Sequence, residues 1–169
     1  MCNRGYNTMK GYYKNPEATA EVIDKNGFLH SGDLGIKDED GYYRITGRIK
    51  DMIIRGGENI YPQRIENFLR QLPGVKDTGV FGLRHCRLGE AVAAQIELAP
   101  GASYTEEEVL DYCQGLPRFE RPLRVFFGPV PRNPTGKIEK QLLQALYQNE
   151  PLPIRRGGPI PGSSQESSP

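Results

Sequence analysis

Apolar residues recur at helical spacing between Tyr61-Pro62 and Pro73-Gly74. They stand at positions i, i+3, i+4 and i+7, which gives a helix one apolar face. These positions are Ile65, Phe68, Leu69 and Leu72. Because proline is tolerated in a first helical turn, the pattern predicts a helix that opens at Tyr61-Pro62 and stops at Pro73.

The rest of the second half alternates between strand-like and helix-like patterns. A short apolar run at Met52–Ile54 ends at Gly56-Gly57 and predicts a strand pair. Further strands are predicted at Val75–Leu83, Ala91–Leu98 and Leu123–Phe127. A capping box, Thr105 with Glu108, starts one helix, and another is predicted from Thr135 onward. The predicted fold is therefore α+β: a β-hairpin and a three-stranded sheet packed with helices.

The first fifty residues predict smaller elements. Asn15-Pro16 opens a short helix that runs to Val22. A turn signal at Asp38–Gly41 separates two strand-like stretches, which predicts a hairpin. Tyr43 and Ile45 alternate with polar neighbours, so we expect them to lie on a half-buried strand.

Composition excludes several classes of protein. Lys+Arg 22 against Asp+Glu 21 leaves the chain nearly neutral, unlike a dedicated nucleic-acid binder. The chain has no apolar run long enough to span a membrane and no signal-peptide pattern near its start. Cys2, Cys86 and Cys113 are odd in number and widely spaced, so neither a disulfide framework nor a zinc site is expected. A reducing, cytoplasmic setting is the default.

Two polar residues near the predicted hairpin are candidates for binding a nucleotide. Asp33 follows the strand-like Phe28-Leu29, where a carboxylate can accept hydrogen bonds from a vicinal diol such as ribose. The alternative is that Asp33 caps a turn. The guanidinium of Arg48 could reach ribose or phosphate oxygens, and its alternative is a solvated charge cluster.

Two further segments are candidates for chemistry. Gly56 and Gly57 lie between charged residues, and paired glycines allow a backbone to approach a ligand closely. Lys137 follows Thr135-Gly136 at the expected start of a helix, a place that suits an anion such as phosphate. An exposed lysine at the helix start is the alternative. His30 and His85 have no suitably spaced partners for a metal site.

Several arginines also leave two interpretations open. They could form a patch for the phosphates of coenzyme A or belong to a solvated surface. They are Arg84, Arg87, Arg118, Arg121 and Arg124.

Taken together, the polar segments resemble one enzyme family. The stretches RGYNTMKGYYKNPEATAEVI, GFLHSGD, DEDGYYRITGRIKDMIIRGGENIYP and NPTGKIEK are similar, in order and spacing, to the C-terminal part of acyl-CoA synthetases. These belong to the AMP-binding, adenylate-forming superfamily. The resemblance covers roughly residues 4–147, and GGENIYP favours acyl- or aryl-CoA ligases over peptide-synthetase adenylation domains.

The resemblance implies roles for single residues. Asp33 and Arg48 would bind the ribose of the nucleotide, and Lys137 would be the adenylation lysine. Lys50 would stand at a hinge, where the family often has Asp. Gly56, Gly57 and Glu58 would form the loop that lines the coenzyme A tunnel.

The resemblance also implies a domain organisation. Residues 1–49 would end the large N-terminal domain, 50–148 would form the C-terminal lid, and 149–169 a disordered tail rich in Pro, Gly and Ser. The substrates implied are ATP with Mg²⁺, coenzyme A and a carboxylic acid, with fatty acids expected.

Residue 1 would lie near the end of the large domain. The acyl pocket, the phosphate loop and the magnesium ligand of the family are therefore not expected in this chain, which alone should be inactive. Two alternatives stay open: a non-catalytic protein that binds or modulates a partner synthetase, and a small nucleotide-binding module.

Overall fold

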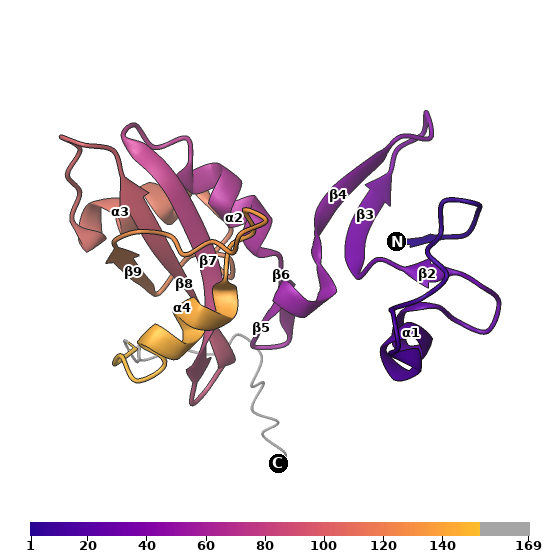
Figure 1. Cartoon of the computed structure of the whole chain (residues 1–169). Coiled ribbons are helices and arrows are strands. Elements are labelled where there is room, and N and C mark those ends of the chain that lie inside the picture. Colours follow the sequence, from indigo (N-terminus) through magenta and orange to yellow (C-terminus); the bar gives the residue numbers. More distant parts are fainter. Residues whose placement is uncertain (153–169) are drawn as a thin grey trace, which may run out of the picture.

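The computed structural model describes residues 1–152, and these fall into two groups of elements (Figure 1). We call residues 1–48 the N-terminal segment and residues 53–147 the sheet domain. The helices are α1 (Pro16–Val22), α2 (Pro62–Leu69), α3 (Glu106–Tyr112) and α4 (Lys140–Tyr147), with 3₁₀ turns η1 (Ile49–Asp51) and η2 (Cys113–Gly115). The strands are β1 (Cys2–Asn3), β2 (Leu29–His30), β3 (Asp33–Lys37), β4 (Tyr43–Arg48), β5 (Ile53–Arg55), β6 (Glu58–Ile60), β7 (Val75–His85), β8 (Gly89–Leu98) and β9 (Arg124–Phe127).

The sheet domain is built on one long antiparallel pair, β7 and β8. Strand β9 runs parallel to β8, with Ala93–Ile96 opposite Arg124–Phe127. The β5–β6 hairpin joins the same edge of β8 through one pair, Arg55 opposite Gly89. The predicted order of elements is confirmed, and the expected hairpin and three-stranded sheet are continuous as one sheet.

Helices cover both faces of this sheet. Alternate residues of a strand point to opposite faces, so neighbouring strand positions feed two separate clusters. The larger cluster packs α2 and α3 on one face and includes Ile65, Leu69, Val109 and Cys113. The smaller cluster packs Leu143 of α4 against Phe81, Leu83 and Ala93 on the other face. The α+β core thus lies entirely within the sheet domain.

Local sequence signals explain two helix starts and correct a third. Helix α2 begins at Pro62 as predicted, and the Thr105–Glu108 capping box is formed at the start of α3. The last helix was predicted from Thr135, but α4 begins at Lys140. The Asn133 side chain accepts hydrogen bonds from the amides of Thr135 and Lys137, at 3.1 and 2.9 Å, and so stabilises a turn instead.

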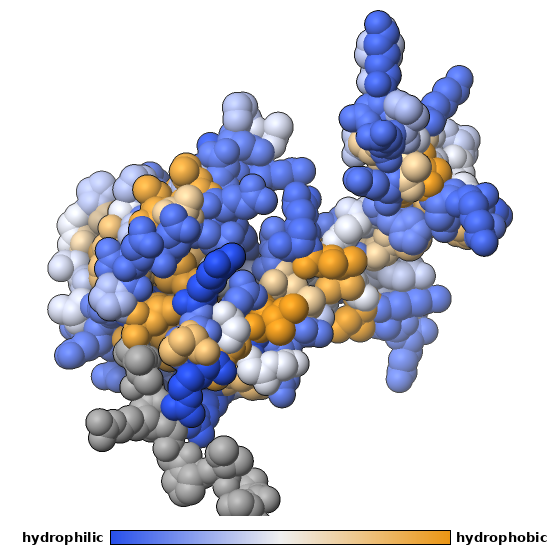
Figure 2. Space-filling view, turned by 90° about the horizontal axis from the view of Figure 1, so that it is seen from below, coloured by the Kyte–Doolittle hydropathy of each residue, from blue (hydrophilic) through white to orange (hydrophobic). Residues whose placement is uncertain are grey.

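The N-terminal segment has little core of its own. In residues 1–52 only Gly47 is buried. The predicted β3–β4 hairpin is present, but Tyr43 is 63% exposed and Ile45 52% exposed. The expectation of a half-buried strand is therefore wrong for this chain, because no element described covers that face. Figure 2 shows apolar surface along the strip between the two groups.

Two further expectations concern the C-terminal tail and membrane-spanning segments. Most of the predicted tail, residues 153–169, lies outside the described residues, whereas the Pro151 carbonyl accepts a 2.7 Å hydrogen bond from Arg124. Within residues 1–152, every helix is too short or too polar to cross a lipid bilayer.

Candidate functional site

Asp33 and Arg48 face each other across the β3–β4 hairpin. They are register partners, and Arg48 Nε donates to Asp33 Oδ1 at 3.0 Å. The side chains are 22% and 38% exposed, respectively, so both remain accessible to a ligand. The sequence patterns gave Asp33 and Arg48 as two separate candidates. The structure brings them together at one end of the hairpin. A carboxylate held by a guanidinium can still accept hydroxyl hydrogen bonds through its second oxygen.

The joint between the two groups follows directly after this pair. Arg48 ends β4, and the 3₁₀ turn η1 carries Lys50, which is exposed. The amide of Ile49 donates to the carbonyl of Gly32 at 2.9 Å, which ties the joint to the start of β3. On the other side, Tyr61 packs on Gly47, where an added Cβ would lie 3.2 Å from the ring carbon Cδ1. The predicted hinge residue thus lies in a short connection.

Gly56 and Gly57 form the exposed turn between β5 and β6. Their φ angles are +59° and +89°, a conformation typical of glycine in two-residue hairpin turns. The Gly56 amide donates to the carbonyl of Leu88 at 2.8 Å. Glu58 follows at the start of β6 and is also exposed. The paired glycines therefore have a structural reason, which does not conflict with a role at a ligand.

Lys137 is exposed and lies in the turn before α4 rather than at a helix N-terminus. Its carbonyl accepts from the Asn133 amide at 2.9 Å, and its own amide donates to Asn133 Oδ1. Gly136, with φ +80°, allows this tight turn. The predicted helix dipole therefore does not act at Lys137, and the backbone of the turn fixes its position instead.

An ion-pair cluster holds the Lys137 turn on the sheet, and a single ion pair holds the start of α4. Arg132 bonds Asp77 of β7 at 2.7 Å, and Arg70 approaches the same carboxylate at 3.5 Å. Burial raises the pKa of Asp77, but hydrogen bonds from Arg132 and the Thr78 amide, with both arginine charges, outweigh it and leave the pKa lowered. Lys140 pairs with the buried Glu66 of α2 at 2.8 Å. The start of α4 is thereby held on α2.

The Lys137 turn and the glycine turn lie at opposite ends of the sheet domain. The first is anchored on Asp77, near the start of β7. The second is bonded to Leu88, just past the end of β7 at His85. Eight residues of antiparallel strand separate Asp77 from His85, which corresponds to about 27 Å. One placement of this domain therefore cannot bring both turns to the same point.

Some contacts at the site were not foreseen from the sequence. Arg55 donates to the carbonyls of Phe119 and Arg121, at 2.9 and 2.8 Å, and so ties the glycine hairpin to the loop before β9. Arg121 donates to Leu116 O at 2.8 Å, and Arg124 pairs with Glu106 at 2.9 Å. Two members of the proposed arginine patch thus serve internal contacts. Spacing along the sequence gave no signal for such long-range partners.

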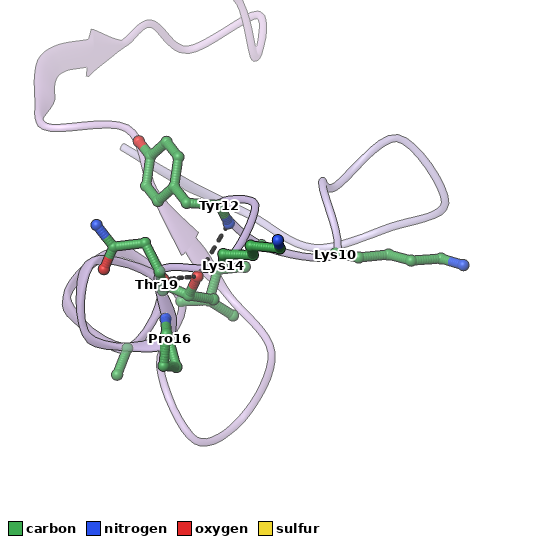
Figure 3. A pocket seen from close by; sticks show the side chains of 9 residues that line it. Lys10, Tyr12, Lys14, Pro16 and Thr19 are labelled. Carbon is green, nitrogen blue, oxygen red and sulfur yellow. Dashed lines mark hydrogen bonds between the residues drawn. The ribbon is translucent and has the colours of Figure 1, made fainter.

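An open hollow of about 500 Å³ lies away from these residues, beside α1 (Figure 3). Lys10, Tyr12 and Lys14 line it, and the Tyr12 amide donates to the Thr19 hydroxyl at 2.9 Å. None of the sequence-predicted site residues borders it. Among the described residues there is also no group of three acidic, histidine or cysteine side chains that could hold a metal ion.

Comparisons with known proteins agree with the motifs. Residues 64–137 match the AMP-binding enzyme C-terminal domain. A 4-hydroxybutyrate–CoA ligase of Metallosphaera sedula is 46% identical over 142 residues, which cover 83% of this chain and 26% of the ligase. The long-chain-fatty-acid–CoA ligase FadD13 of Mycobacterium tuberculosis is 43% identical, over 82% of this chain and 28% of that protein. The chain thus spans about a quarter of the length of these curated relatives.

Solved structures add information on shape. ATP-bound MatB from Rhodopseudomonas palustris has a TM-score of 0.80 and 40% identity, over 86% of this chain and 29% of MatB. Apo MatB, at the same identity and coverage of this chain, has a TM-score of 0.63. Since sequence and coverage are equal, the two MatB structures differ in shape over this region, and the present chain is closer to the ATP-bound one. The chain therefore carries the C-terminal domain of the AMP-binding enzyme family and corresponds to the C-terminal part of acyl-CoA synthetases.

Proposed function

We propose that this chain acts as the nucleotide-binding edge and mobile lid of an ATP-dependent acid–thiol ligase. Such a ligase joins a carboxylic acid to AMP, with release of pyrophosphate, and then transfers the acyl group to the thiol of coenzyme A. The observation that carries the proposal is the placement of the Lys137 turn and the glycine turn at opposite ends of the sheet domain. A lid with two working ends can serve two successive transition states in one pocket.

In the first half-reaction, Asp33 accepts hydrogen bonds from the ribose hydroxyls while Arg48 holds its carboxylate. Lys137 then supplies positive charge where it develops between the attacking carboxylate and the α-phosphate. Mg²⁺ arrives as part of the MgATP substrate. The closer match to the ATP-bound shape of MatB supports this arrangement as the one that this chain adopts.

In the second half-reaction, the sheet domain rotates about Lys50 and brings Gly56, Gly57 and Glu58 to the pocket. Two adjacent glycines leave the turn without side chains, so that the narrow pantetheine arm of coenzyme A can pass along its backbone. Rotation at one short connection requires only a few dihedral changes. The exposed η1 turn offers such a connection.

The partner of the N-terminal segment is the large domain of a synthetase. Large apolar side chains are exposed there, among them Tyr42, Tyr43 and Ile45, at 75%, 63% and 52%. Such a surface is typical of an interface. A cytoplasmic location and a fatty-acid substrate belong to the same proposal.

A chimera tests the two ends separately. Residues 1–152 would replace the matching C-terminal part of R. palustris MatB, and adenylation would be followed by exchange of pyrophosphate into ATP. Thioester formation would be measured from acyl-adenylate supplied directly. The isolated chain, as a control, should catalyse neither step.

Lys137→Ala should slow adenylation by about 10²–10³-fold, because one charge-stabilising donor is lost, and leave thioester formation within about twofold. Gly57→Val should do the opposite, since valine disfavours a φ of +89°. Lys76→Ala, which removes another exposed lysine of the domain, is the matched control. An active chimera in which Lys137→Ala slows both steps equally would contradict the division of labour.

A further inference from the structure

Three side chains of the N-terminal segment form a hydrogen-bonded chain that the proposed ligase function does not use. Cys2 of β1 stands directly opposite His30 of β2, and its Sγ lies 3.4 Å from His30 Nδ1. On the other side of the ring, His30 Nε2 lies 3.1 Å from Asp24 Oδ2. Both ring nitrogens are thus engaged, one with a thiol and one with a carboxylate.

The carboxylate at the end of this chain is fixed by its own turn. Asp24 Oδ1 accepts from the amides of Phe28 and Asn26, at 3.0 and 2.9 Å. The hydrogen bond from the Phe28 amide, and to a smaller extent the one from His30, lowers the pKa of Asp24. This carboxylate is therefore ionised at neutral pH. Arg4 also holds the turn, since it donates to the Asn26 carbonyl at 3.3 Å.

An ionised carboxylate only accepts hydrogen bonds, so His30 Nε2 must donate to Asp24. In the neutral ring this leaves Nδ1 as an acceptor that faces the Cys2 thiol. The order carboxylate, imidazole, thiol is the arrangement in which a base takes a proton from a nucleophile while a third group orients the base. Cys2 is exposed, so a reagent can reach it.

We propose that Cys2 is a reactive thiol that exchanges with small disulfides, with His30 as its base and Asp24 as the residue that orients His30. His30 takes the thiol proton, and the Cys2 thiolate attacks one sulfur of the disulfide. A new bond forms between Cys2 and that sulfur, the original disulfide bond breaks, and the other half leaves as a thiolate. Cys2 ends as a mixed disulfide, which excess thiol reverses.

The modification site is connected to the nucleotide-binding edge. His30 lies three residues before Asp33, and the Ser31 amide donates to the Met1 carbonyl at 3.0 Å. The strand pair that carries Cys2 and His30 therefore continues directly into the segment that carries Asp33. A group attached to Cys2 adds bulk at this strand pair.

The chain supplies its own controls. Cys86 is exposed too, but no imidazole or carboxylate is hydrogen-bonded to its thiol in the described part of the chain. Cys113 is buried, and burial raises the pKa of its thiol to about 11. An ordinary thiol is only about 3% ionised at pH 7, and a more acidic thiol is also less nucleophilic. A thiol with a pKa near 7 is about half ionised at this pH but about fivefold less nucleophilic, so full activation of Cys2 corresponds to a rate about threefold above that of Cys86.

The test measures the rate of reaction with dithiodipyridine, whose leaving thiol absorbs light. This probe is uncharged, so Arg84 and Arg87 beside Cys86 do not attract it. Cys86→Ser leaves Cys2 as the exposed cysteine of the chain, and Cys2→Ser leaves Cys86. The proposal expects the first variant to react about threefold faster than the second at pH 7. Equal rates would overturn it, and this comparison needs no change at His30 or Asp24.

Further variants, made in the Cys86→Ser background, separate the two supporting residues. His30→Gln should lower the Cys2 rate to that of Cys86, and Asp24→Asn should give an intermediate rate. Asp38→Asn is the matched control, because Asp38 also caps a turn, through the Tyr42 amide at 2.8 Å, but contacts no histidine. An unchanged rate in His30→Gln would overturn the role of the base. Reaction of a second equivalent would reveal unfolding, since it requires exposure of Cys113.

Discussion

The sheet domain and the N-terminal segment carry similar patterns of apolar residues but use them differently. Every buried hydrophobic residue of the described chain belongs to residues 53–147, whereas Gly47 is the buried residue of residues 1–52. The sheet domain pairs the faces of its sheet with its own helices. The N-terminal segment is held by strand pairing and turn hydrogen bonds, with its apolar side chains exposed. An apolar face in a sequence therefore predicts a surface that another element can cover, but it does not identify that element.

The largest expected effect is on a matched pair of isoleucines. Ile65→Ala should lower the free energy of unfolding by about 3 kcal/mol, because it leaves a cavity in the core. Ile45→Ala should change it by less than about 0.5 kcal/mol. The two side chains are 0% and 52% exposed. Urea denaturation followed by circular dichroism measures both, and similar losses would show that the N-terminal segment has a core after all.

The ion pairs of the two regions should differ in the same direction. Lys140→Met leaves the Glu66 carboxylate, which is 5% exposed, with the Val80 amide as its partner. We expect a loss of about 2 kcal/mol, since an unpaired buried charge is costly and Lys140 is partly screened by solvent. Arg48→Met, on the more exposed pair with Asp33, should cost less than about 1 kcal/mol. Thermal unfolding of both variants would decide, and a larger loss for Arg48→Met would reverse the comparison.

The contact between the two regions can be broken at Gly47. A valine there meets the Tyr61 ring, since even an added Cβ would lie 3.2 Å from it. To avoid this clash, the β3–β4 hairpin should move away from the sheet domain, with a loss of about 1–2 kcal/mol of contact energy between the two regions. Small-angle X-ray scattering should detect a larger radius of gyration. The double variant with Tyr61→Ala should restore the original value, and no change in either protein would contradict the proposed joint.

The smallest expected effect is the loss of stability at low pH, which should involve the Asp77 end of the sheet domain and not the glycine turn at the other end. The pKa of Asp77 is lowered below 3.8 in the folded chain, so its ion pair stabilises the fold above that pH. This contribution, less than about 1 kcal/mol, is lost as the pH falls through the folded pKa. Chemical shifts of the Arg132 side-chain N–H should move in this range, and Asp77→Asn should abolish the change. Gly56 and Gly57 should not respond, and a response there would show that the two ends are coupled.

Sequence patterns predicted the sheet domain well because its interactions are periodic or local. The i, i+3, i+4, i+7 spacing located α2, and the Thr105–Glu108 pair located α3, since a capping box involves residues close in sequence. The start of α4 was wrong because Asn133 and Gly136 stabilise a turn that competes with the helix. The exposure of Tyr43 could not be predicted, because alternation identifies a face and not what covers it.

The site was predicted residue by residue, and its geometry was not. The motifs identified Asp33 and Arg48, but only the β3–β4 register made them partners. No spacing in the sequence relates Arg132 to Asp77 or Lys140 to Glu66, since each contact joins segments far apart in the chain. The roles of all the predicted site residues stay predictions: Asp33, Arg48, Lys50, Lys137 and Gly56–Glu58.

The hydrogen bonds around the glycine turn have a mechanical consequence. Besides the bond from Gly56 to Leu88, the Ile54 amide donates to Glu90 Oε2 at 2.7 Å, and Arg55 is fixed on two carbonyls of the loop before β9. The β5–β6 hairpin is therefore hydrogen-bonded to the rest of the domain at its turn as well as along its strands. Because of these contacts, the hairpin cannot bend independently of the sheet. The proposed movement of the glycine turn would therefore carry the whole sheet domain with it, and the changes in backbone angle would fall in residues 49–52.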